Sequence, residues 1–204
     1  MSLSRRLFGP SKKEIWKQLS EQVQGRFVKG AFLRGDKVLV EHGPWTLTLD
    51  TYAVSTGKAT VVFTRMRAPY VNPGQFRFNV YRESVFSGIA KRLGMQDIEI
   101  GDPPFDEGFI VKSNDPSRVR ELLSNARMRE LLSKQKDVHL EVRDDEGWFG
   151  TKFPDGVDEL HFTVVGVIKD IERLKLLFEL FAETLDGLLR IGAAEDRPPN
   201  VEVK

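Results

Sequence analysis

From Phe27 onwards, apolar and polar residues alternate along several short segments that turn residues separate. A period of two is typical of β-strands with one buried face, because successive side chains of a strand point to opposite sides of the sheet. The short turns between these segments favour antiparallel pairing of each strand with the next. The strands predicted in this region are 37–41, 45–55, 59–68 and 76–82.

The stretch 105–143 has the clearest pattern in the chain and predicts the order strand, helix, helix, strand. Asp115 and Pro116 follow the first strand; the aspartate is a good N-cap and proline at the first helical position has no amide to lose. Asn125 offers a second N-cap within the helical region, and alternation resumes at 138–142. We therefore expect a helical pair packed on an antiparallel sheet.

Helical spacing of apolar residues also predicts a helix at 12–24 and a long helix at 170–189. Ser11 and Glu14 have the spacing of a capping box. The apolar stripe of 170–189 is wide, which favours either a helix between two layers or a homodimer in which a second copy covers part of it. Weaker patterns predict a helix at 84–93 and strands at 97–100, 148–153 and 159–168.

These elements predict an α+β fold, with antiparallel β-sheet covered by helices and a long C-terminal helix. The predicted organisation is a flexible tail at 1–11, a single domain at 12–192 and a tail at 193–204. Gly101 to Pro104 form a rigid turn, so two lobes meeting near 101–104 are the alternative to one undivided domain.

Composition excludes several classes of function. The formal net charge is +1 and there is no cysteine, so nucleic acid is not an expected partner and thiolate or cysteine–metal chemistry is ruled out. No apolar run reaches the length needed to cross a bilayer, and no secretory signal follows Met1. We expect a cytoplasmic protein, with an anchor upstream of Met1 left open, and a basic N-terminus suited only to weak contact with a membrane surface.

The sequence contains no recognisable catalytic motif. It has neither a phosphate loop nor a G-x-G-x-x-G or G-x-S-x-G pattern. His139 and His161 occupy polar positions of two strands, but no metal-binding spacing accompanies them. We therefore predict no catalytic residues, no metal and no cofactor.

One cationic cluster is a candidate ligand site. Arginines alternate out of two predicted strands, with tyrosines beside them, and guanidinium groups suit phosphate or carboxylate ligands. The candidate anion-binding residues are Arg65, Arg67, Arg77, Tyr70 and Tyr81. The competing interpretation is that Asp50 and Glu83 neutralise the arginines as cross-strand pairs.

Several blocks of the chain resemble an uncharacterised family of bacterial soluble proteins. They include LFGPSKKEIW, HGPWTLTLDTYAVSTG, TRMRAPYV, GMQDIEIGDPPFDEGFIVKSND and FPDGVDELHFTVVGVIKDIERLKLLFELF. The resemblance covers nearly the whole chain and implies a bacterial source, without an assigned activity or catalytic residues.

The residues favour a non-catalytic binding or protein-interaction module over an enzyme. The alternative is an enzyme or binding protein acting on a phosphate- or carboxylate-bearing ligand at the arginine-lined face. A deep pocket holding a carboxylate with a displaced pKa would favour the enzyme, and a flat face would favour the module.

Overall fold

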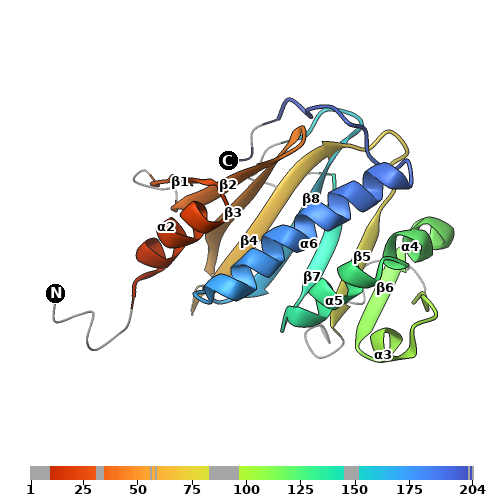
Figure 1. Cartoon of the computed structure of the whole chain (residues 1–204), viewed down its shortest axis with the longest axis horizontal. Helices are drawn as coiled ribbons and strands as arrows, with labels where there is room; N and C mark the ends of the chain where they lie inside the picture. The colour runs from red at the N-terminus through yellow and green to blue at the C-terminus, as the bar shows by residue number, and fades with distance from the viewer. Residues whose placement is uncertain are drawn as a thin grey trace.

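The computed structural model describes residues 10–30, 35–55, 57, 59–82, 97–144, 152–201 and 203. These residues form one antiparallel sheet of eight strands with helices packed on one face, which confirms the predicted α+β fold (Figure 1). The sheet order is β1 (Arg26–Val28), β2 (Lys37–His42), β3 (Trp45–Ser55), β4 (Thr60–Val71), β8 (Val157–Val165), β7 (His139–Arg143), β5 (Phe78–Arg82) and β6 (Phe109–Ser113). The helices are α2 (Lys12–Gln22), α3 (Pro103–Asp106), α4 (Pro116–Leu123), α5 (Ala126–Lys134) and α6 (Ile171–Arg190).

The predicted pairing of each strand with the next is confirmed between β2, β3 and β4 and is wrong between β4 and β5. β1 to β4 pair in chain order, but β4 pairs with β8, and β5 pairs with β6 and β7. The register of β4 with β8 is long, from Phe63 opposite Val165 to Val71 opposite Val157. β8 and β7 therefore separate the two arginine-bearing strands that the sequence pattern placed side by side.

The predicted helix caps are confirmed. Ser11 and Glu14 form the capping box of α2, and the carboxylate of Asp115 accepts from the first two free amides of α4. Asn125 caps α5 in the same way, and Asp170 accepts from an amide of the first turn of α6. Each cap satisfies amides that the helix itself leaves without partners, so these short polar residues set where the helices begin.

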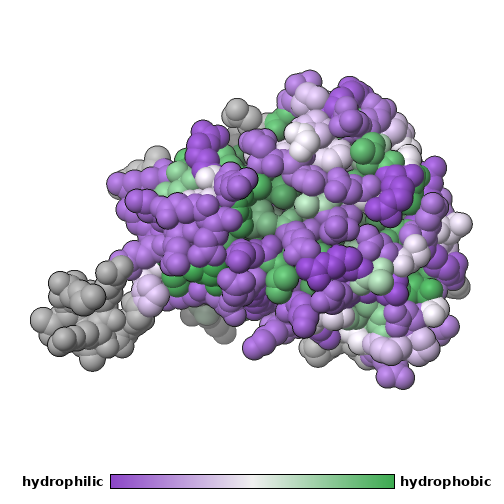
Figure 2. Space-filling model, in the orientation of Figure 1, coloured by the Kyte–Doolittle hydropathy of each residue, from purple (hydrophilic) through white to green (hydrophobic). Residues whose placement is uncertain are grey.

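α6 lies diagonally across one face of the sheet, with α2 on one side and α4 and α5 on the other (Figure 1). Most of its apolar stripe is buried against the sheet and the flanking helices, whereas Leu189 is 36% exposed, and the predicted homodimer through this helix stays a prediction. Trp16 of α2 is fully buried and its indole Nε1 donates to the carbonyl of Ile168, at 3.2 Å. The outer surface of this helical layer is mainly hydrophilic, with hydrophobic residues showing between α2 and α6 (Figure 2).

The end of α2 and the weaker predicted elements agree with the structure only in part. α2 ends two residues earlier than predicted, because Gln24 adopts a left-handed conformation with φ of 53°. Residues 97–100 form no strand, although the amide of Ile98 donates to the carbonyl of Val111. The helix predicted at 84–93 and most of the strand predicted at 148–153 lie outside the described residues. Within those residues, none of the helices is long and apolar enough to cross a membrane.

Trp16→Ala tests whether α2 is held by its buried indole. The substitution leaves a cavity beneath the helix and should lower the free energy of unfolding by about 3–5 kcal/mol. Denaturant unfolding measures the loss, and Lys17→Ala on the exposed side of the same helix is the matched control, expected to change stability by less than about 0.5 kcal/mol. Equal effects of the two substitutions would contradict the packing described for α2.

Candidate functional site

The face of the sheet turned away from the helices carries a band of polar side chains that crosses every strand. Residues opposite one another in the strand register lie on the same face. One such row runs from edge to edge through Arg26, Leu39, Thr48, Arg67, His161, Glu141, Asn79 and Lys112. The row is polar at all but one position, although most of its members are buried.

Asp50 holds the two central arginines of this face. Arg65 donates from Nε and Nη2 to the two carboxylate oxygens of Asp50, both at 2.8 Å, and Nη2 of Arg67 donates to Oδ2 of the same group at 2.7 Å. Burial raises the pKa of Asp50, but the hydrogen bond from Arg65 and the two positive charges outweigh it, so the pKa lies below its ordinary value. The carboxylate is therefore ionised and both guanidinium groups have an anionic partner.

Glu141 is the centre of a second buried group, on β7. Arg143 donates to its carboxylate, and the rings of His139 and His161 lie near it, with nitrogen-to-oxygen distances of 3.4 and 3.7 Å. The two histidines lie on neighbouring strands, since β7 pairs with β8. Burial, followed by the charge of Arg143, holds the pKa of His161 well below its usual value. No group of acids and histidines in the described residues is arranged to hold a metal ion.

Glu159 lies between these two groups and is buried. It is fully buried opposite Pro69 on β4 and Arg143 on β7. Neither of its carboxylate oxygens has a hydrogen-bond partner in the part of the chain that the structure describes. Burial raises the pKa of Glu159 to about 7, although the charges of Arg67, Arg65 and Arg143 act in the opposite direction.

The structure brings together only part of the predicted anion site. Arg65 and Arg67 lie side by side and share Asp50, which is the neutralised arrangement that the sequence also suggested. Tyr81 is two strands further across the sheet from β8 and packs edge-on against His139, with ring centroids 6.1 Å apart. Glu83, the other proposed neutralising acid, lies outside the described residues.

The remaining two predicted site residues lie elsewhere. Arg77, just before β5, pairs with Asp144 at 2.9 Å and with Asp158 at 3.5 Å. Tyr70 is buried in the hydrophobic core, on the face of β4 that the helices cover. Alternation along β4 explains this position, because Tyr70 follows Arg67 by three residues and so points the opposite way.

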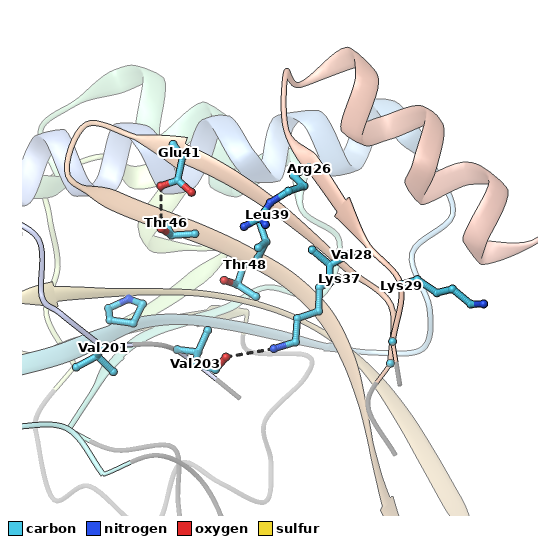
Figure 3. A pocket seen from close by; sticks show the side chains of 13 residues that line it. Arg26, Val28, Lys29, Lys37, Leu39, Glu41, Thr46, Thr48, Val201 and Val203 are labelled. Atoms are coloured by element: carbon cyan, nitrogen blue, oxygen red, sulfur yellow. Dashed lines mark hydrogen bonds between the residues drawn. The ribbon is translucent and has the colours of Figure 1, made fainter. Parts of the chain in front are cut away.

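A groove of about 460 Å³ opens on the uncovered face beside these buried groups (Figure 3). Its walls come from β1, β2, β3, Pro69 of β4 and the end of the chain. The lining side chains are Arg26, Val28, Lys29, Lys37, Leu39, Glu41, Thr46, Thr48, Pro69, Val201 and Val203, with Gly30 and Gly35. Thr48 and Pro69 are the cross-strand neighbours of Arg67 and Glu159, so the groove adjoins the buried polar cluster.

The groove is positively charged. Arg26, Lys29 and Lys37 line it, and Glu41, which accepts from the hydroxyl of Thr46 at 2.8 Å, is the one acid among the lining residues that the structure describes. Arg26 and Lys29 form no ion pair with any described residue, and Lys37 donates to the backbone carbonyl of Val203 at 3.2 Å. The exposed side chains of Arg26 and Lys29 are therefore the cations of the groove that have no anionic partner among the described residues.

Sequence patterns did not reveal this groove. β1 has only three residues, and the alternation of Val201 and Val203 is too short to distinguish from a tail. The available signal was the pair of basic residues that flank Phe27 and Val28, together with the apolar alternation at the C-terminus. Neither is specific without knowledge that the two segments meet.

Comparisons with known proteins add one distant similarity. No protein-family model matches the chain, and no curated protein matches its sequence. Among solved structures, the chain is similar to the crystal structure of the mycobacterial trehalose monomycolate transport factor A, TtfA, with a TM-score of 0.47 and 10% sequence identity over 94% of this chain and 98% of that chain. A similarity at this level carries no argument about a ligand, and the resemblance to a bacterial family stays a prediction.

Asp50→Asn tests the central charge cluster. Removing the negative charge leaves two largely buried guanidinium groups without their counter-ion, so the free energy of unfolding should fall by about 3–5 kcal/mol. Chemical denaturation measures it. Asp186→Asn is the control, because Asp186 forms an exposed pair with His42 that should contribute less than about 1 kcal/mol. If Asp50→Asn lowers the free energy of unfolding no more than Asp186→Asn does, Asp50 does not stabilise this face of the sheet.

Glu159→Gln tests the buried carboxylate through the pH dependence of stability. The pKa of Glu159 is about 7 in the folded protein, against an ordinary value of 4.5. Because the folded-state pKa is raised, the stabilisation is complete below about pH 4.5 and is lost as the pH rises through 7, by roughly 3 kcal/mol. The wild-type melting temperature should therefore fall between pH 5 and pH 8 by more than that of Glu159→Gln.

The control for this experiment is Glu107→Gln, at an exposed position of the chain. It should keep the wild-type pH dependence. If Glu159→Gln and Glu107→Gln melt in parallel with the wild type across the pH range, the proton uptake assigned to Glu159 does not occur.

Proposed function

We propose that this protein is a non-catalytic binding module that takes a small anionic ligand in the groove formed by β1, β2, β3 and the end of the chain. The observation that carries the proposal is the pair Arg26 and Lys29, two cations in a concave site with no carboxylate partner among the described residues. Lys37 adds a third positive charge on the same walls. A phosphate or carboxylate is the ligand group that such a set of donors recognises.

The size and shape of the groove support a small-molecule ligand. Pockets for small ligands usually enclose about 300–1,000 Å³, are mostly apolar and contain a few polar groups that fix orientation. The groove has this composition and lies within that range, at about 460 Å³. Partial enclosure strengthens the attraction between the cations and an anion, because the walls replace water of high dielectric constant.

The lining favours binding over chemistry. Among the described lining residues the one acid, Glu41, is exposed and hydrogen-bonded to Thr46, and none is a histidine or a serine. Glu159, whose pKa is displaced to about 7, lies behind Pro69 and does not line the groove. A general acid or base must come within hydrogen-bond reach of the substrate, and the buried carboxylate has no such access here.

The double variant Arg26→Glu/Lys29→Glu tests the site. Isothermal titration with sodium decanoate and with inorganic phosphate should show binding of at least one of these anions to the wild type. Reversing two charges at the rim should weaken that binding by roughly tenfold or more, since charge-assisted hydrogen bonds are the strong ones. Binding by the wild type should also weaken as salt is added.

Lys13→Glu/Lys17→Glu is the matched control, because both lysines lie on the exposed side of α2. It carries the same change of net charge and should keep wild-type affinity. Equal losses in the two double variants would mean that net charge, not the groove, sets the affinity, and the absence of binding to the wild type would rule out the proposed site.

A further inference from the structure

The end of the chain passes from the helix-covered face of the sheet to the opposite face. After α6, the amides of Ala193 and Ala194 donate to the carbonyl of Leu188, at 2.8 and 3.1 Å, and both alanines are buried. The amide of Glu195 then donates to the carbonyl of Val71, the last residue of β4, at 3.1 Å. From that point the chain runs back to end beside β1 and β2 (Figure 1).

Val201 and Val203, near the end of the chain, form an apolar wall of the groove. Asn200 has a φ of 55°, a left-handed conformation that asparagine tolerates better than most residues, and it turns the chain just before Val201. Val201 and Val203 are two residues apart, so in an extended segment they face the same side, and both line the groove. The bond from Lys37 Nζ to the carbonyl of Val203 fastens this segment to β2 (Figure 3).

Apolar residues also line the sheet side of the groove. Val28, Leu39 and Pro69 belong to β1, β2 and β4, and they share the cavity with the two valines of the chain end. In Figure 3, Lys29 and Val201 lie at opposite ends of the view, and Lys37 lies between them with its ammonium beside Val203. A ligand that satisfies both the cations and the valines must itself have an anionic end and an apolar one.

We infer that the ligand is a single-chain amphiphilic anion, an alkyl carboxylate or an alkyl phosphate, with its head at Arg26 and Lys29 and its chain beneath Val201 and Val203. This inference rests on the proposed function and adds the class of ligand to it. An inorganic anion leaves the apolar walls of the groove exposed to water. A neutral apolar molecule leaves Arg26 and Lys29 without an anionic ligand group. Burying both kinds of surface by one molecule avoids both costs.

A chain-length series tests the inference. The probes are acetate, hexanoate, octanoate and decanoate, with inorganic phosphate and dodecyl phosphate as the second head group, all below their micelle concentrations, titrated calorimetrically into the full chain. Affinity should rise roughly fourfold for each methylene that enters the groove, because each buried methylene contributes about the same transfer free energy. The heat capacity change should become more negative along the series.

The variant Val201→Ser/Val203→Ser removes apolar surface from the chain-end wall and should flatten the dependence on chain length while keeping the dependence on Arg26 and Lys29. The control is Val165→Ser/Val167→Ser, at exposed valines away from the groove, which should leave the series unchanged. If acetate or inorganic phosphate binds as tightly as decanoate, and the charge-reversal variant still abolishes binding, the amphiphile is wrong and the anion site stands. If no probe binds, both fail.

Discussion

The shared carboxylate of Asp50 is the interaction on which the uncovered face of the sheet depends. Its two oxygens accept three hydrogen bonds from Arg65 and Arg67, across the junction of β3 and β4. β4 pairs with β8 on its other edge, and β8 pairs with β7. The remaining polar strands are therefore built on β4, the strand whose two arginines Asp50 neutralises. Because both arginines pair with an internal carboxylate, they stabilise the fold, and the proposed ligand site lies instead at the cations on the rim of the groove.

Insertion of β8 and β7 between β4 and β5 gives the sheet its two unlike faces. Apolar positions of all the long strands meet α6 and its neighbours, while their polar positions align in rows that the helices do not reach. The same row that holds Arg67 and His161 continues through Thr48 and Leu39 to Arg26. The groove is therefore the outer, exposed end of a band whose inner part is buried and internally paired.

Features that depend on residues close together in the chain were predictable from the sequence. Which strands lie next to each other in the sheet was not. Caps such as Asp115 and Asp170, and the alternation around Leu47, depend on residues a few positions apart, so pattern and structure agree. Alternation assigns a side chain to a face but does not say which strand lies beside it. Arg77 was therefore placed next to Arg65, although two strands separate them. The groove joins Arg26 to Val203, and no local pattern links residues so distant in the chain.

Glu159 lies in the buried part of the polar band, next to the exposed groove. Sequences usually satisfy every buried polar group, and departures from that rule concentrate where a protein works or stores strain. Glu159 is buried and has no hydrogen-bond partner among the residues that the structure describes, yet three arginines lie close enough to oppose the rise in its pKa. It follows Asp158, which is bound by Asn72, and faces Pro69, which can donate no hydrogen bond. Pro69 also forms a wall of the groove, so one residue lies between the buried acid and the apolar surface offered to the proposed ligand.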